Sequence, residues 1–426
     1  MRDSVINRQT ALAHLIVLSL RVDVERAGFE AALAACGDID WPRFFRCVDG
    51  HGVTPLVADR WQALGLLDRL PIEVRDRLLK ARRDNAARND RVRREVIEYW
   101  QLIAEANVPA ILLKGWPLVE MLYHSPALRL ITDMDLLIPA VHAPVALRAL
   151  QLAGLEPLPA NRDAWVEKHL PAYWRLNGRA VVYPLANMFD PLHPRSIELH
   201  THLWETNFRG LRLGDPAGVW ERSRVTHVAG CPMRTLSLDD ILIHLCVHWA
   251  CHWIEREARL IQLVDLDRFV RAFGAQLDWP LIARVSHQAQ VTRFVFAALM
   301  IAHRTFGAPR PPLPITDELR AGCPPPLRRR VDRSAADAVA LMDQRRPDKG
   351  AAYVLTWSSA LGLREWLGVA RYALLPPREF IIGRYRLKRR WLAIPFYIPY
   401  VLGRTWRTVW PFARALTRFA RLGSEV

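Results

Sequence analysis

The segment Asp133-Met134-Asp135 has the residue types and the spacing of a metal-binding carboxylate pair. It lies in an apolar run that stops at Pro139, which predicts a β-strand. On a strand, residues i and i+2 point to the same face, so both carboxylates project together. Two like charges this close repel each other unless a cation lies between them. The pair therefore predicts a site for a hard divalent cation such as Mg²⁺; the alternative is the solvated side of an edge strand.

Glu198 is the candidate for a third carboxylate. The segment Ser196–His200 alternates polar and apolar residues, as a half-buried strand does. Three carboxylates on one face are what two-metal phosphoryl transfer requires. His200 and His202 share the face of Glu198 if the strand is regular. Two interpretations stay open: the histidines line a pocket for the acceptor of such a transfer, or they are satisfied polar residues at a sheet edge.

Lys114 and Gly115 follow a second apolar run, residues 108–113, which predicts a buried strand and a turn. A turn glycine lets the backbone approach a phosphate, and a lysine supplies positive charge. Neither GxxxxGK[ST] nor GxGxxG is present in the sequence. A turn glycine beside a solvated lysine is therefore the competing interpretation of this segment.

His244, His248 and His252 have the spacing i, i+4 and i+8, which stacks them along one side of a helix. With Cys251 nearby, they suggest a zinc hydrolase as a different chemistry. The sequence contains no HExxH motif, and the neighbouring residues are apolar. Histidines packed at a helix interface are the favoured interpretation.

The elements that position these residues predict an α+β fold, with a small mixed-sheet α/β core in a mostly helical chain. Residues 1–106 show helical periodicity, and residues 107–235 follow the order strand, helix, strand, helix. Residues 236–308 are predicted to be helices that pack on this unit. Residues 309–426 are predicted to hold a linker with seven prolines between 309 and 326, then helices and a basic aromatic tail.

The composition indicates a globular chain with anionic partners. Of the 426 residues 51% are hydrophobic, which excludes disorder as the dominant state, and the formal net charge is +16. Six cysteines without a CxxC pair exclude a disulfide scaffold, and the first residues lack the order of a signal peptide. We therefore expect a reducing, cytoplasmic location.

The C-terminal tail carries most of the net positive charge. Residues 371–422 contain twelve basic residues and one acid, Glu379. The apolar stretch 391–403 within them is too short to span a membrane and contains Pro395 and Pro399. Basic residues beside apolar ones predict peripheral contact with an anionic membrane, at its inner surface. Nucleic acid is less favoured, because the apolar residues exceed what phosphate binding needs; an Arg-rich face packed on the α/β core is the third interpretation.

Several of these segments together resemble a known family. Leu112 to Gly115, Tyr123, Arg129 and Asp133 to Ile138 look like the core of an uncharacterised bacterial nucleotidyltransferase family. That family belongs to the DNA polymerase beta-type nucleotidyltransferase superfamily. The similarity covers roughly residues 25–400 and includes the segments 41–66, 244–248, 264–266 and 375–380.

The resemblance implies a nucleotidyltransferase that moves a nucleoside monophosphate from an NTP to an unidentified acceptor, with two Mg²⁺ ions. Members of the family are often associated with surface polysaccharide or peptide natural-product pathways. The implied roles are metal ligands for Asp133, Asp135 and Glu198, the last also as a base, and phosphate binding for Lys114, Gly115 and Arg129.

One departure from the superfamily pattern keeps a second function open. Trp116 follows Gly115 where the superfamily usually has glycine or serine, which weakens the expectation of a triphosphate bound at this turn. The alternative is a catalytically inactive nucleotidyltransferase fold that serves as a binding or scaffold protein at the membrane surface.

Overall fold

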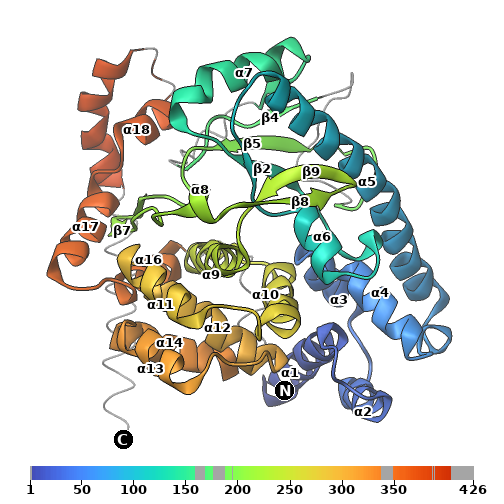
Figure 1. Cartoon of the computed structure of the whole chain (residues 1–426). Coiled ribbons are helices and arrows are strands. Elements are labelled where there is room, and N and C mark those ends of the chain that lie inside the picture. Colours follow the sequence, from blue (N-terminus) through green and yellow to red (C-terminus); the bar gives the residue numbers. More distant parts are fainter. Residues whose placement is uncertain are drawn as a thin grey trace, which may run out of the picture.

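The computed structural model describes residues 2–158, 168–175, 188–193, 195–336, 349–385, 387 and 389–403. It is an α+β structure in which one mixed sheet is embedded among helices (Figure 1). The fold class expected from the sequence is therefore confirmed. The part of the predicted basic tail beyond residue 403 lies outside the described residues.

The N-terminal part is helical because apolar residues recur at helical spacing and the helix starts carry suitable caps. At the start of α3, for example, the Asp40 carboxylate accepts a hydrogen bond from the backbone N–H of Arg43, and Pro42 occupies the first turn. The long helix α5 packs its first half in one apolar cluster and its second half in another. The helices are α1 (Arg2–Leu20), α2 (Arg26–Cys36), α3 (Trp41–Gly50), α4 (Thr54–Ala63) and α5 (Ile72–Glu105).

The central sheet has seven strands in the order β3-β4-β5-β2-β1-β9-β8. Strand β2 pairs antiparallel with β1 and parallel with β5, and β9 pairs parallel with β1. The pairing of β2 with β5 decides the site, because it sets which side chains of the two strands are neighbours. The strands are β1 (Ile111–Leu112), β2 (Asp133–Leu137), β3 (Glu156–Pro157), β4 (Tyr173–Trp174), β5 (Ser196–His200), β8 (Arg224–Val228) and β9 (Cys231–Thr235), and β6 (Asn207–Phe208) and β7 (Leu211–Arg212) form a separate hairpin.

Helices surround the sheet on several sides. Figure 1 shows α5 along one edge, α7 at the top and the helices α9 to α14 below the sheet. Helix α9 begins at Ser237, whose hydroxyl accepts a hydrogen bond from the N–H of Asp240, and it supplies twelve buried residues. The helices are α6 (Trp116–Leu122), α7 (Ala143–Leu152), α8 (Val219–Arg222), α9 (Leu238–Glu255), α10 (Leu260–Phe273), α11 (Trp279–Gln288) and α12 (Thr292–Phe306).

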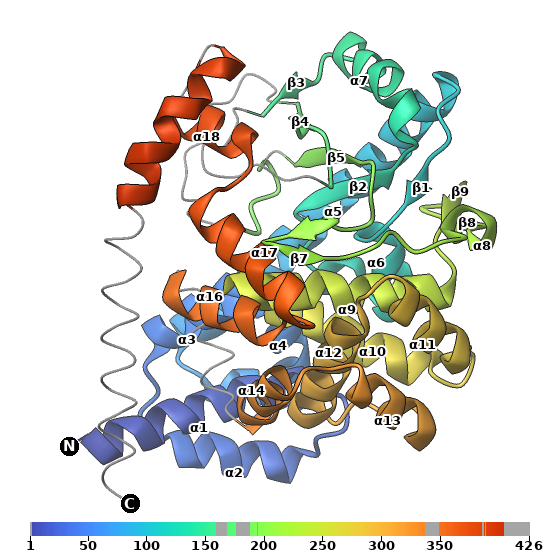
Figure 2. The same cartoon turned by 90° about the vertical axis from the view of Figure 1, so that its left-hand side faces the viewer.

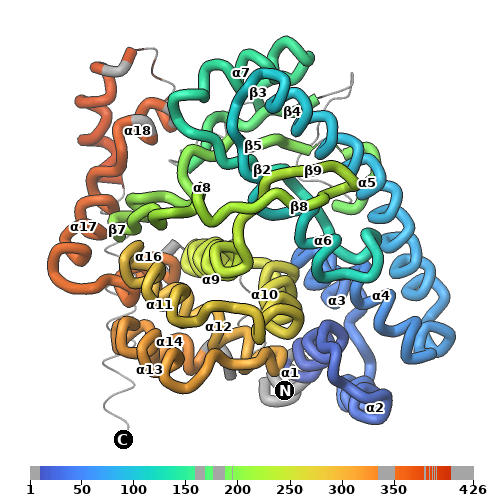
Figure 3. The backbone as a smooth tube through the Cα atoms, viewed as in Figure 1, coloured from blue at the N-terminus to red at the C-terminus, as the bar shows by residue number. Residues whose placement is uncertain are grey.

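The proline-rich stretch 309–326 differs from the expected linker. It contains helix α13 (Leu313–Ala321) and the start of α14 (Pro325–Ala336), and both pack against α12. Prolines occupy the first turns of these helices, where a missing N–H costs nothing. Helix α1 from the blue N-terminal end of the chain packs against orange α12 (Figure 3).

The last described elements are α16 (Lys349–Ser358), α17 (Leu363–Leu374), α18 (Arg378–Tyr385) and a final helix over residues 393–403. They lie together on one side of the molecule, which faces the viewer in Figure 2. Among the described helices, none combines the length and the apolar character needed to cross a bilayer.

Candidate active site

The acidic cluster lies where β2 and β5 run side by side. Their parallel register places Asp135 directly opposite Glu198 and Leu137 opposite His200. The His200 Nε2 atom lies 2.9 Å from Asp135 Oδ1 and 3.7 Å from Glu198 Oε2. Asp135 and His200 are almost fully buried. Two strands far apart in the chain thus bring two carboxylates and an imidazole together.

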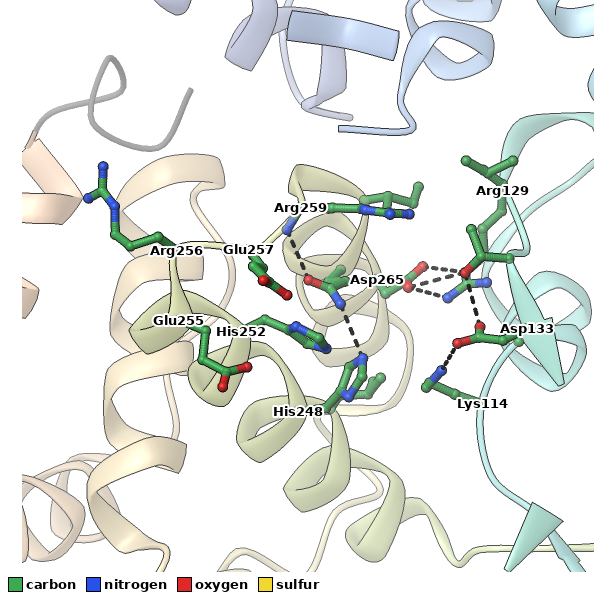
Figure 4. A pocket seen from close by; sticks show the side chains of 16 residues that line it. Lys114, Arg129, Asp133, His248, His252, Glu255, Arg256, Glu257, Arg259 and Asp265 are labelled. Atoms are coloured by element: carbon green, nitrogen blue, oxygen red, sulfur yellow. Dashed lines mark hydrogen bonds and ion pairs between the residues drawn. The ribbon is translucent and has the colours of Figure 1, made fainter. Parts of the chain in front are cut away.

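Asp133 joins this cluster through Lys114. The Lys114 ammonium lies 3.2 Å from Asp133 Oδ2 and also forms an ion pair with Asp135. Because one ammonium contacts both carboxylates, the structure places the two aspartates on the same face of β2 (Figure 4 shows Lys114 and Asp133). The turn after β1 therefore brings a cation to the point where the carboxylate charges converge.

The charges of the cluster stabilise one another despite burial. Burial by itself raises the pKa of Asp135, but Lys114 and His200 overcome it and hold that pKa well below its ordinary value. Burial likewise opposes protonation of His200, and the Asp135 and Glu198 carboxylates outweigh it and raise the pKa of the imidazole. The pKa of Glu198 is lowered, because nearby His200 outweighs burial. The carboxylates are therefore ionised at neutral pH.

His169 is a member of this cluster that the sequence did not reveal. Its Nε2 atom lies 3.6 Å from Glu198 Oε2, and its ring centroid lies 5.4 Å from that of His200. An isolated antiparallel bridge between residues 169 and 200 holds it there. Burial lowers the pKa of His169, so its imidazole is neutral at neutral pH. No local motif marks this histidine, because its position depends on a contact with β5.

A pocket of about 440 Å³ opens beside the cluster (Figure 4). One wall holds Lys114, Gly115 and Asp133, and the opposite wall holds the end of α9, residues 255–259 and the start of α10. This pocket has the size of a small-molecule site. It is lined by Lys114, Gly115, Arg129, Leu130, Thr132, Asp133, Leu245, His248, His252, Glu255, Arg256, Glu257, Arg259, Ile261, Gln262 and Asp265.

Trp116 does not obstruct the turn at Gly115. The Trp116 side chain is only 3% exposed, packs in the apolar cluster behind the sheet and donates an indole hydrogen bond of 2.7 Å to Glu120. It is not among the residues that line the pocket. Gly115 adopts a φ of +85°, a conformation that favours glycine, and its backbone faces the pocket.

Arg129 lines the pocket, but its guanidinium is bound to Asp265. Arg129 Nε and Nη2 donate to the two carboxylate oxygens of Asp265 at 2.9 and 2.7 Å, and the Tyr123 hydroxyl donates to the same carboxylate at 2.6 Å. These groups are buried, so the ion pair joins the turn before β2 to α10. This geometry assigns Arg129 to the packing of the site.

Arg259 is a second cation at the pocket that the sequence did not single out. Its side chain extends across the pocket toward Arg129 in Figure 4. Within the described part of the chain its guanidinium has no ion pair, and burial lowers its pKa. Such a guanidinium is suited to an anionic ligand.

The other predicted histidines are not members of the acidic cluster, but His248 and His252 line the pocket beside it. The His202 ring lies against the Asp215 carboxylate beyond the end of β5. His244, His248 and His252 do lie along one side of α9, and burial lowers the pKa of His244 and His252 to about 3. His248 receives a hydrogen bond from Gln262. These imidazoles are neutral, and the three do not converge on a common point.

Two groups in the described residues have donor atoms close enough to hold a metal ion. The first is Asp135, Glu198 and His200, and the second is His252, Glu255 and Glu257, each with its ligand atoms within 4.8 Å of one another. The first group offers mainly hard oxygen donors and already attracts the Lys114 ammonium, so its residues fit a divalent cation. Of the three histidines considered for a zinc site, His252 alone belongs to either group.

Comparison with known proteins gives one family. A family model described as an uncharacterised nucleotidyltransferase matches residues 37–307, which is more than half of the chain and contains the whole acidic cluster and pocket. No curated protein and no solved structure matches the chain.

Proposed function

The chain belongs to the uncharacterised nucleotidyltransferase family, and from this we propose that it transfers a nucleoside monophosphate from an NTP to an acceptor. The same proposal includes membership of the DNA polymerase beta-type superfamily and residues 107–235 as the catalytic domain. The observation that carries it is the register of β2 with β5, in which Asp135 lies beside Glu198 next to a pocket of about 440 Å³.

We assign metal binding to Asp133, Asp135 and Glu198, with His200 beside them. Two Mg²⁺ ions are expected, since carboxylate oxygens are the ligands that Mg²⁺ prefers. When bound, such ions neutralise phosphate charge and activate the attacking oxygen. His200 holds the Asp135 carboxylate in place through its 2.9 Å contact, which orients a metal ligand.

Phosphate binding is assigned to both walls of the pocket. Lys114 supplies charge from the β1 turn, where the Gly115 backbone allows close approach. Arg259 supplies charge from the opposite wall, in place of Arg129, which is bound to Asp265. In this proposal Glu198, ionised and beside neutral His169, accepts the proton of an acceptor hydroxyl.

The test is isothermal titration of the four NTPs, with and without Mg²⁺, into wild type and the Asp133→Ala/Asp135→Ala variant. We expect metal-dependent binding that the double variant loses. The isosteric Asp135→Asn variant separates loss of charge from loss of packing, and Asp215→Ala, which removes an aspartate outside the cluster, should bind as wild type does. Metal-independent binding, or binding that survives in the double variant, would contradict the proposal.

The alternative function is a catalytically inactive binding or scaffold protein at the membrane surface. The feature that favours it is Lys114, which gives the two aspartates a counter-charge from the chain itself. A scaffold of this kind gains no thermal stability from NTP with Mg²⁺, whereas the enzyme does.

Identification of the reaction product would reveal the acceptor and the preferred base. It would also show whether the protein acts in polysaccharide or in peptide natural-product biosynthesis. A cytoplasmic location, with peripheral contact at the inner membrane surface through residues 371–422, belongs to the same proposal.

A further inference from the structure

Exposed apolar side chains gather on the C-terminal helices. Ten of the large hydrophobic residues that the structure leaves exposed lie between residues 361 and 402. They belong to α17, its flanking turns and the final helix, which share one side of the molecule (Figure 2). We call them the C-terminal face: Leu361, Leu363, Trp366, Leu367, Leu374, Leu375, Trp391, Ile394, Ile398 and Leu402.

The final helix is apolar on both sides. Its inner side, with Ala393 and Tyr400, packs on Ile381 of α18 in a small separate cluster. Its outer side shows Ile394 and Ile398 at 67% and 66% exposure. Residues 391–403 contain no charged residue at all. A helix that is apolar all round requires a second apolar surface to cover its outer side.

Contacts with the core hold helix α17 in place, so its exposed side has a defined position in the structure. Buried Glu365 accepts hydrogen bonds from the backbone N–H groups of Arg212 and Leu361 and from the guanidinium of Arg293 at 3.0 Å. The backbones of Gly210 and Gly368 approach so closely that a Cβ on Gly210 would lie 2.4 Å from the Gly368 oxygen. The inner side of α17 therefore belongs to the hairpin β6–β7 and to α12.

The charges around the C-terminal face are mainly positive. Residues 361–403 contain eight basic residues and two acids, Glu365 and Glu379. Glu365 is buried and bound to Arg293, so it adds no negative charge to the surface. Basic side chains are exposed on the same elements, namely Arg364, Arg371, Arg378, Arg384 and Arg389.

We propose that the C-terminal face is a docking surface for an anionic lipid bilayer. Aromatic and aliphatic side chains with arginines around them are the combination that an anionic membrane surface binds, through apolar burial and attraction to the head groups. The face begins at Leu361, just before helix α17. It therefore extends toward the N-terminus beyond residues 371–422, the tail predicted from the sequence. This inference rests on the membrane contact included in the proposed function and deepens it by naming the surface and the lipid charge; it does not require nucleotidyl transfer.

The test is co-sedimentation of the full chain with vesicles, without nucleotide. One set of vesicles contains phosphatidylcholine alone and the other equal parts of phosphatidylcholine and phosphatidylglycerol. We expect binding to the anionic vesicles that weakens with salt, and a loss of about tenfold or more in the partition coefficient for Ile394→Ser/Ile398→Ser. Arg364→Gln/Arg371→Gln should lose affinity for anionic vesicles only.

The matched control replaces two equally exposed apolar residues elsewhere. Val141→Ser/Leu152→Ser removes side chains that are 81% and 77% exposed near α7, and it should bind vesicles as wild type does. Because all these side chains are exposed, circular dichroism should show the variants folded.

Three outcomes overturn the proposal: no binding of wild type to anionic vesicles, equal binding by the face and control variants, or single-stranded RNA bound in place of vesicles. Self-association that the Ile394→Ser/Ile398→Ser variant abolishes, without vesicle binding, would assign the face to a second copy of the chain. Nucleotide titration is measured without vesicles, so failure of either proposal is recognised separately.

Discussion

Replacement of His244 should change how the stability of the protein depends on pH. His244 is 3% exposed on α9, and no described group forms a hydrogen bond with either ring nitrogen. Burial, with a smaller contribution from the positive charge of Lys114, lowers its pKa to about 3. An unfolded histidine titrates near its ordinary value of about 6.5. Between these two pKa values the unfolded chain binds more protons, so the free energy of unfolding falls as the pH falls.

The size of the effect follows from the two pKa values. A pH of about 5 lies about 1.5 units below the pKa of the unfolded histidine. Each unit of difference corresponds to about 1.36 kcal/mol. His244 should therefore cost the folded state roughly 2 kcal/mol on going from about pH 8 to about pH 5. In His244→Leu this contribution disappears, while half-buried His252, whose pKa is also about 3, retains its own.

Urea denaturation followed by tryptophan fluorescence at the two pH values measures the difference. We expect the loss of stability between about pH 8 and about pH 5 to be smaller by roughly 2 kcal/mol in His244→Leu than in wild type. His227→Leu, which replaces an exposed histidine on β8, should leave the loss unchanged. An equal pH dependence in wild type and His244→Leu would refute the conclusion that this imidazole is buried in its neutral form.

Three other substitutions test the assignments around the pocket. Asp265→Ala should lower the free energy of unfolding by about 3–5 kcal/mol in urea denaturation, because it leaves buried Arg129 without its partner; a loss below about 1 kcal/mol would mean that Arg129 is satisfied in another way. Arg259→Ala should weaken NTP binding by about tenfold or more in calorimetry, since a charge-assisted hydrogen bond is lost, with an unchanged melting temperature; unchanged affinity would exclude Arg259 from the phosphate site. Trp116→Phe removes the 2.7 Å hydrogen bond to Glu120 and should cost about 1 kcal/mol of stability without altering NTP affinity, so a loss of affinity would show that the indole serves the pocket.

The local geometry of the site was accessible from the sequence. The spacing of Asp133 and Asp135 on a strand places both on one face, because side chains of a strand alternate with a period of two. The alternation around Glu198 predicts a second strand for the same reason, and the glycine at 115 marks the turn after β1. Each of these inferences depends only on residues within a few positions of one another.

Which groups meet across the site was decided by the tertiary structure. Glu198 lies beside Asp135 because β5 pairs in parallel with β2, and no local pattern specifies that register. The guanidinium of Arg129, which the sequence suggested for phosphate binding, is bound to Asp265, 136 residues away in the chain. The period of the backbone determines the face on which a side chain lies, but the charge of a long-range neighbour determines whether that side chain is free to bind a ligand.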